Sequence, residues 1–292
     1  MSKIRSLLAA TDFSDDARQA VLRAAFLAAE QEAQLGVLHV MSGRSLNFMR
    51  ELFKLSSDAD TKLIDDAKRM LDELVDDVAE KTKLTAVRQV RVGDVVNEII
   101  SASGQADMLV LGARGLNPLR DLLLGTTAEN LLRKCKCPIL VNKRPPHGPY
   151  QRVIVPVDLS PHSIAALRTA VQVAPRAGIT IVHAFDVPFE GKLWLAGVEE
   201  QEIHRYRIQA RLDAQEKIGT LMQNLDNTSF RLHAIIEHGD AARVILEQEE
   251  AASPDLIVIG KHGQSVVGEL LLGSVTRHVL SNARCDVLVV NE

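Results

Sequence analysis

The chain has 292 residues, of which 46% are hydrophobic and 25% charged. These values are typical of a folded protein of about two average domains and not of a disordered one. A formal net charge of −4 and an aromatic content of 3% give no general support for a nucleic-acid partner or an anionic membrane. No apolar run approaches the ~20 residues of a membrane span, the N-terminus lacks a signal-peptide pattern, and the three cysteines are too few for a disulfide framework. We therefore expect a cytoplasmic protein.

The sequence repeats itself once. Residues 5–14 match residues 151–160, and residues 106–115 match residues 254–263 in the same order. Collinear self-similarity of this kind indicates a duplicated domain. The proline-rich stretch between the two copies suits an extended connection. We therefore predict a first domain over residues 1–143, a linker over 144–150 and a second domain over 151–292.

Each copy reads as strands alternating with helices. In the first copy, short apolar runs predict strands at about 5–10, 35–41, 85–92, 107–112 and 138–142. In the second copy they predict strands at about 152–157, 179–185, 230–238, 255–260 and 285–290. Runs this short and this rich in Val, Ile and Leu are typical of strands buried on both faces. Amphipathic patterns predict helices between them, the longest at about 59–82 and 198–224.

Helices between successive strands require crossover connections and therefore a parallel sheet. The predicted fold class is α/β, with two tandem doubly wound domains of five strands each and helices on both faces of each sheet. In such sheets a ligand binds beyond the carboxyl ends of the strands, where the strand order reverses. The residues that follow each strand are therefore the candidates for a binding site.

An aspartate and a serine follow the first strand of both copies. The first copy reads Thr11-Asp12-Phe13-Ser14, and the second has Asp158 and Ser160 at the matching positions. Ser14 and Ser160 are explained equally well as helix N-caps. A carboxylate so close to the end of the strand can accept a hydrogen bond from a ribose hydroxyl or a base amino group, which favours a binding role for the two aspartates.

A glycine pattern follows the fourth strand of both copies. The first copy has Gly112 and Gly115 and, after nine residues, Gly125, Thr126 and Thr127; the second has Gly260 and Gly263 and, after nine residues, Gly273, Ser274, Val275 and Thr276. Glycines admit a close ligand, and a Gly-Thr or Gly-Ser step that opens a helix offers free amides, a hydroxyl and the positive end of the helix dipole to phosphate. The alternative is a glycine C-cap with a tight loop and a Ser or Thr N-cap. Two copies with the same spacing favour phosphate binding.

The sequence lacks the motifs that identify three common classes of protein. The sequence contains no P-loop motif, no G-x-G-x-x-G after a first strand and no G-x-S-x-G elbow. These absences disfavour P-loop NTPases, the dinucleotide-binding folds and serine hydrolases.

The chain resembles the universal stress protein family, in its tandem form, over essentially its whole length. The resemblance rests on the pattern G-x2-G-x9-G-[ST] in both copies, TDFS at 11–14, VDLS at 157–160, LHV at 38–40 and CPILV at 137–141. It implies a parallel sheet of strand order 3-2-1-4-5 in each domain and ATP at the switch point of members that keep the glycines. It also implies pairing of the last strands of two domains, here an intramolecular pseudo-dimer, with a homodimer as a further expectation.

The resemblance assigns nucleotide contacts by position. Asp12 and Asp158 would face the adenosine, Thr11 precedes the first of them, and Val40 would lie against adenine. The ribose and phosphate loop would comprise Gly112, Gly115, Gly125, Thr126 and Thr127 in the first copy and Gly260, Gly263, Gly273, Ser274, Val275 and Thr276 in the second. The copies depart from each other at Ala128, which matches Thr276, and at Ala184, which matches Val40. Unequal affinities are therefore expected.

The expected function is ATP binding, with Mg²⁺ as the accompanying ion, by a nucleotide-dependent regulator or stress-survival factor. Asp121 and Glu269, inside the glycine loops, are candidate neighbours of Mg²⁺. No residue supplies a convincing general base, so rapid hydrolysis is not expected and no catalytic or metal-ligating residue is assigned. Two alternatives stay open: a slow ATPase or nucleotidyl transferase that uses Asp12 or Asp158, and a scaffold that holds a ligand other than a nucleotide.

Two histidines and two longer segments are interpreted as structural. His39 and His183 occupy equivalent strand ends and are interpreted as packed, hydrogen-bonded histidines. The segments 46–55 and 188–207 are interpreted as helices packed against the other domain rather than as lids or partner surfaces.

Overall fold

The computed structural model describes residues 3–44, 57–115, 124–187, 190–224, 231–263 and 271–291. The strands of the first half are β1 (Ser6–Thr11), β2 (Gln34–Ser42), β3 (Ala86–Gly93), β4 (Met108–Gly112) and β5 (Ile139–Asn142), and its helices are α1 (Asp15–Gln31), α3 (Ser57–Thr82), α4 (Val95–Ser103) and α5 (Thr126–Lys134). The strands of the second half are β6 (Arg152–Pro156), β7 (Gly178–Phe185), β8 (Leu232–His238), β9 (Leu256–Gly260) and β10 (Asp286–Val290). Its helices are α6 (Pro161–Val173), α7 (Glu190–Leu195), α8 (Glu200–Gln223), α9 (Ala241–Ala252) and α10 (Ser274–Asn282).

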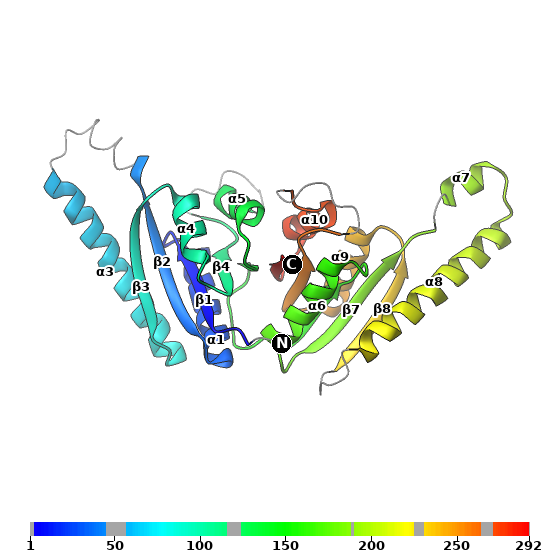
Figure 1. The fold of residues 1–292 in the computed structure, drawn as a ribbon, viewed down its shortest axis with the longest axis horizontal. Helices are drawn as coiled ribbons and strands as arrows, with labels where there is room; N and C mark the ends of the chain where they lie inside the picture. Colours follow the sequence, from blue (N-terminus) through cyan, green and yellow to red (C-terminus); the bar gives the residue numbers. More distant parts are fainter. Residues whose placement is uncertain are drawn as a thin grey trace.

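One ten-stranded sheet runs through both halves, in the order β3-β2-β1-β4-β5-β10-β9-β6-β7-β8 (Figure 1). The pairs inside each half are parallel. At the centre, β5 and β10 are antiparallel, with Leu140 opposite Leu288. The predicted fold class, two tandem doubly wound α/β domains, is confirmed.

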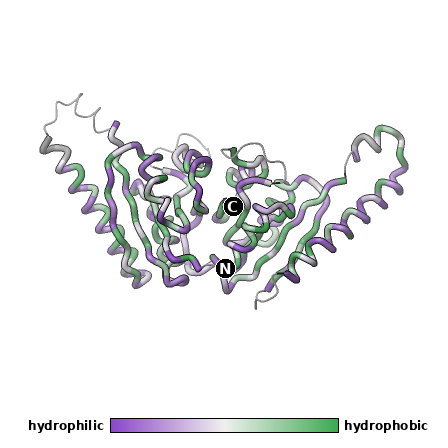
Figure 2. Tube along the Cα trace, viewed as in Figure 1, coloured by the Kyte–Doolittle hydropathy of each residue, from purple (hydrophilic) through white to green (hydrophobic). Residues whose placement is uncertain are grey.

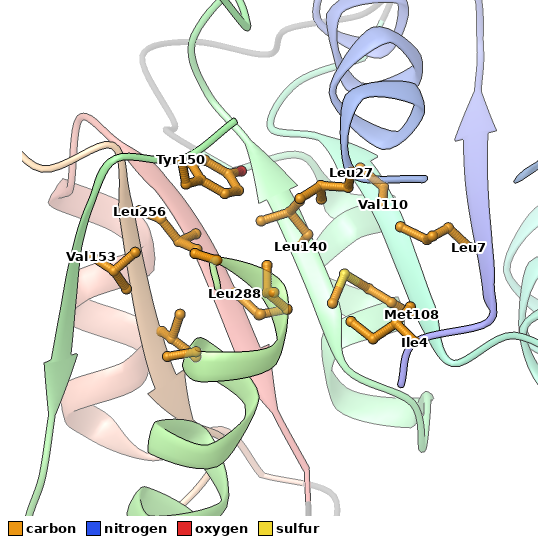
Figure 3. Close-up of a cluster of buried hydrophobic side chains, with 14 of the residues drawn as sticks. Ile4, Leu7, Leu27, Met108, Val110, Leu140, Tyr150, Val153, Leu256 and Leu288 are labelled. Atoms are coloured by element: carbon orange, nitrogen blue, oxygen red, sulfur yellow. The ribbon is translucent and has the colours of Figure 1, made fainter. Parts of the chain in front are cut away.

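The inner strands of the sheet, such as β4, β9 and β10, are buried on both faces, which explains why they read as apolar runs. The edge strands β3 and β8 are partly exposed and carry polar residues. Successive residues of β1 alternate between two hydrophobic clusters: Leu7 and Ala9 belong to the cluster under α1 and α3, and Leu8 and Ala10 to the cluster under α4 and α5. Figure 2 shows the hydrophobic residues gathered in the strands, while α3 and α8 alternate along their length. The first cluster crosses the junction between the halves, where Leu140, Tyr150 and Leu288 lie together (Figure 3).

Helix α8 does not pack as the sequence analysis expected. It lies on β7 and β8 of its own half, and Figure 1 shows it at the outer end of the molecule, away from the first half. The interpretation of 188–207 as helices packed against the other domain is therefore wrong. Trp194 and Leu195 of α7 are strongly exposed. The segment 46–55 lies wholly outside the described residues. In the part of the chain that the structure describes, no helix combines the length and apolar character needed to cross a membrane.

Candidate functional site

A cavity of about 380 Å³ opens at the carboxyl ends of β1 and β4. This is the switch point of the first half, because β1 pairs with β2 on one side and with β4 on the other. The structure brings together there all the site residues predicted for the first copy. The cavity lining includes Thr11, Asp12, Val40, Gly112, Gly115, Gly125, Thr126 and Thr127.

The loop after β1 is held by its own side chains. Asp12 Oδ1 accepts hydrogen bonds from the Ser14 amide (3.1 Å) and the Ser14 hydroxyl (2.6 Å), and Ser14 Oγ accepts in turn from the Ala17 amide (3.3 Å). Phe13, between them, has a φ of 65°, a backbone conformation that costs about 1 kcal/mol or more for a residue other than glycine. Ser14 is therefore the N-cap of α1, and it also orients the carboxylate of Asp12.

The second half repeats this loop. Asp158 Oδ1 accepts from the Ser160 amide (3.0 Å) and hydroxyl (2.6 Å), Ser160 caps α6, and Leu159 has a φ of 65°. Two sequences that share only Asp and Ser in this loop thus fold into the same strained turn. The turn is built by those two residues and not by the residue with the positive φ.

The glycines of the pattern have three different roles. A Cβ on Gly112 would lie 2.8 Å from the backbone carbon of Asp16 at the start of α1, so this glycine is required by close packing of strand on helix. A Cβ on Gly115 would lie 2.6 Å from Asp12 Oδ2, so this glycine makes room for the carboxylate. Gly125 differs: its φ of −72° and ψ of 149° suit any residue, and a Cβ there would make only an ordinary contact of 3.5 Å with Ala113 O. The fold does not require a glycine at position 125.

The helices that begin at this pattern differ from their neighbours at the N-cap. Helices α1, α4, α6 and α9 are capped by the side chains of Ser14, Asp94, Ser160 and Asp240. Helices α5 and α10 begin after Gly125 and Gly273, and no side chain caps either one. The start of α5 borders the cavity, and an uncapped helix N-terminus, with free first-turn amides and the positive end of the dipole, suits an anion.

The two copies differ at three points of the site. Thr11 Oγ1 accepts from the Phe13 amide (3.0 Å), a bond that Val157 in the second copy has no atom to make. Thr276 is buried and its hydroxyl donates to the Gly260 carbonyl (2.8 Å), so it fastens α10 to the end of β9, whereas Ala128 takes its place in the first copy. The third difference is Val275, which is partly buried at the start of α10, whereas the matching Thr127 at the start of α5 is exposed.

His39 and His183 are packed against the loops after β1 and β6. Their Nδ1 atoms lie 2.8 Å from Thr11 O and 2.6 Å from Val157 O. The His39 ring also stacks on Phe13, with centroids 4.3 Å apart. Burial lowers the pKa of His39, so its imidazole is neutral near pH 7. Asp121 and Glu269, the candidate neighbours of Mg²⁺, lie outside the described residues.

A second cavity, of about 980 Å³, lies between α7 and α8 and is lined in part by Glu190, Trp194 and His238. Glu190 forms an ion pair with Arg207 and lies 2.9 Å from His238 Nε2, and Asp186 lies 3.7 Å from the same imidazole nitrogen. Hydrogen bonding from Arg207 lowers the pKa of Glu190. These polar contacts tie the start of α7 to α8 and to the end of β8.

A buried charged cluster at the junction of the halves was not singled out from the sequence. Asp286, 1% exposed at the start of β10, accepts from Tyr150 Oη (2.7 Å), Asn142 Nδ2 (2.9 Å) and the Lys143 amide (2.8 Å). Arg23 Nε lies 3.2 Å from the same carboxylate, and its guanidinium sits 4.2 Å above the Tyr150 ring. The sequence signal for this cluster is Asp286 itself. A carboxylate at the start of an apolar strand is buried there, and a buried charge needs polar partners.

Lys143, beside this cluster, gives a pH-dependent stability. Burial lowers its pKa from 10.5 to about 8. Between about pH 8 and pH 10 the native chain has lost this proton while the unfolded chain keeps it, so the free energy of unfolding rises by up to about 1.4 kcal/mol per pH unit. Urea unfolding at about pH 7.5, 8.5 and 9.5 should show this rise in the wild type relative to Lys143→Met; parallel profiles would contradict it.

Comparison with known proteins matches both halves of the chain to one family. The sequence model of the universal stress protein family matches residues 3–143 and again residues 149–291. A universal stress protein of Mycolicibacterium smegmatis is 28% identical over 299 residues, which cover 97% of this chain and 96% of that protein. Solved universal stress proteins of Archaeoglobus fulgidus (TM-score 0.67, 22% identity, 98% of both chains) and Pseudomonas aeruginosa (putative; TM-score 0.63, 19% identity, 99% of this chain and 93% of that one) share the fold. The chain belongs to the universal stress protein family and carries the family's domain twice.

Proposed function

We propose that the chain binds ATP at two sites, one at the switch point of each half, and acts as a nucleotide-dependent regulator or stress-survival factor. The observation that carries the proposal is the start of α5. Gly125 is a glycine that the fold does not need, at the uncapped N-terminus of a helix that borders a cavity. A phosphate group explains all three features, because it needs backbone amides and room for close approach.

The rest of the first cavity suits a nucleoside. Leu38, Val40 and Ile99 supply an apolar wall, and Asp12 supplies an oriented carboxylate beside Gly115 of the glycine loop. A volume of about 380 Å³ is within the usual range of ~300–1,000 Å³ for small-molecule sites. The donor set therefore fits an adenine nucleotide, with Mg²⁺ accompanying its phosphates.

The second site is proposed on the matching residues. Asp158 has the same hydrogen bonds as Asp12, and Gly263 makes room for its carboxylate, with a Cβ there only 2.7 Å from Asp158 Oδ2. Gly273 opens α10 without a side-chain cap. The differences at Val157, Ala184 and Thr276 support unequal affinities for the two sites.

The first test is the nucleotide content of the purified protein. Denatured wild type should release about two ATP per chain, and Gly125→Leu and Gly273→Leu should each remove one, because the leucine fills the phosphate position. The released nucleotide is quantified by ion-exchange chromatography with mass detection. Added ATP–Mg²⁺ is titrated by calorimetry where nucleotide is lost in purification.

The matched control is Gly219→Leu on α8, where an added Cβ meets nothing within 4 Å. It should leave the ATP content unchanged. One ATP per chain, lost with only one of the two site substitutions, would restrict binding to one half. Absence of ATP in the wild type, together with no binding of added ATP–Mg²⁺, would overturn the proposal and leave the scaffold alternative.

A further inference from the structure

The two helices of the proposed phosphate sites run from their own site to the opposite half. Helix α5 begins at Gly125 in the first half, and its last turn accepts hydrogen bonds from second-half side chains: Lys261 Nζ donates to Arg133 O (2.9 Å) and Asn291 Nδ2 to Cys135 O (2.9 Å). Helix α10 begins at Gly273, and Lys143 Nζ from the first half donates to its terminal carbonyls (2.6 Å each). Each helix end is thus held across the junction.

Lys261 belongs to the glycine loop of the second proposed site and contacts the far end of the helix that begins at the first. It stands between Gly260 and Gly263 in the glycine loop of the second half, and its carbonyl accepts from the Gly273 amide (3.0 Å), which places the start of α10. Its side chain is buried and crosses to the C-terminal end of α5. One residue therefore fixes the phosphate glycine of the second site and the helix of the first.

Among the described residues of the first half, the contact with α10 is made by Lys143, which follows β5, and not by the glycine loop. Ala113 occupies the matching position, and its carbonyl accepts from the Gly125 amide (2.8 Å) in the same way. Its methyl side chain cannot reach α10. The bond that places each phosphate glycine is shared by both halves, whereas the connection to the other site belongs to Lys261.

We propose that Lys261 is a positioning residue that couples the two nucleotide sites. A cation at the C-terminus of α5 complements the helix dipole and favours an anion at its N-terminus. Nucleotide at the second site fixes the loop that carries Lys261 and so holds its Nζ at Arg133. Occupancy of the second site therefore raises the affinity of the first, and linkage requires the reverse effect to be equal. This inference rests on the proposed function.

The test measures ATP–Mg²⁺ binding to the full chain by calorimetry. The affinity of the first site is measured in Gly273→Leu, in which the second site is closed. It is compared with the affinity of the first site in the wild type, in which both sites fill. We expect it to be about 3- to 10-fold weaker in Gly273→Leu. Gly125→Leu should weaken the second site by the same factor.

The Lys261 variants separate coupling from a structural role. In Lys261→Met the two sites should fill independently, so that adding Gly273→Leu no longer changes the first-site affinity, and Lys261→Arg should restore the coupling. Lys81→Met, which removes an exposed cation on α3, should leave the coupling factor at its wild-type value. A Lys261 side chain that only stabilised the fold would change the melting temperature and not this factor.

Two results would overturn the proposal, and they differ. If the wild type binds two ATP independently, or if Lys261→Met keeps the wild-type coupling factor, the coupling through Lys261 is refuted while nucleotide binding stands. If the wild type binds no ATP, the proposed function itself fails, and the coupling fails with it.

Discussion

Asp286→Ala should lower the free energy of unfolding by about 3–5 kcal/mol, because it removes one partner of a buried charge pair. Arg23 would stay buried without the carboxylate of Asp286 beside it. The hydroxyl of Tyr150 would lose its acceptor, and the side-chain amide of Asn142 would lose one of its two acceptors. The loss should be visible as a lower urea midpoint by circular dichroism. Because these groups come from both halves, it should destabilise the junction rather than one domain.

The matched control is Asp66→Ala on α3. Asp66 is also paired with an arginine, Arg69, but both side chains are more than half exposed, and such pairs contribute about 0–1 kcal/mol. A loss below about 1 kcal/mol for Asp286→Ala would mean that water or a local rearrangement replaces the carboxylate.

Gly112→Ala should destabilise the fold and Gly125→Ala should leave its stability almost unchanged, although both glycines belong to one sequence pattern. The added methyl at 112 would lie 2.8–2.9 Å from the backbone of Asp16 and Ala17, and neither strand nor helix can move without disturbing the core. We expect a loss of about 2–3 kcal/mol, typical of an overpacked interior. At 125 the methyl meets only ordinary contacts, and the change should stay within about 0.5 kcal/mol.

The comparison is made by urea unfolding of protein stripped of nucleotide, so that ligand binding does not contribute. Gly260→Ala serves as a second reference, since its methyl would lie 3.0 Å from His162 and should cost less than the change at 112. Equal losses at 112 and 125 would show that the fold requires both glycines, which would remove the main support for a phosphate at Gly125.

The strands could be predicted from the sequence almost to the residue, and the reason is physical. Strands buried on both faces must be apolar throughout, so the runs at 107–112 and 255–260 mark β4 and β9 directly. The duplication placed the glycine loops and the two aspartates at equivalent strand ends. It could not separate Gly112, required by a helix backbone, from Gly125, which is not, because that difference lies in contacts between distant segments.

The junction could not be predicted in the same way. The partners of Asp286 come from α1, β5 and the linker, and nothing in the sequence around Arg23 or Tyr150 indicates that these residues contact it. Lys261 is a polar residue in a loop that predicts solvent exposure, yet its side chain is buried against α5. Helix α8 was misplaced for a related reason: its amphipathic pattern identifies a buried face and does not say which strands cover it.

Joining β5 and β10 within one polypeptide has a consequence for how the protein can vary. Two separate chains that met along this edge would form an isologous interface, in which any substitution appears on both sides of the axis. They would also come apart on dilution, whereas a tether keeps the effective concentration of the partner strand in the millimolar range. The covalent link removes both constraints. Asp286 stands where the first half has Pro138, and Lys261 where it has Ala113, so the two sides of the junction can carry different residues.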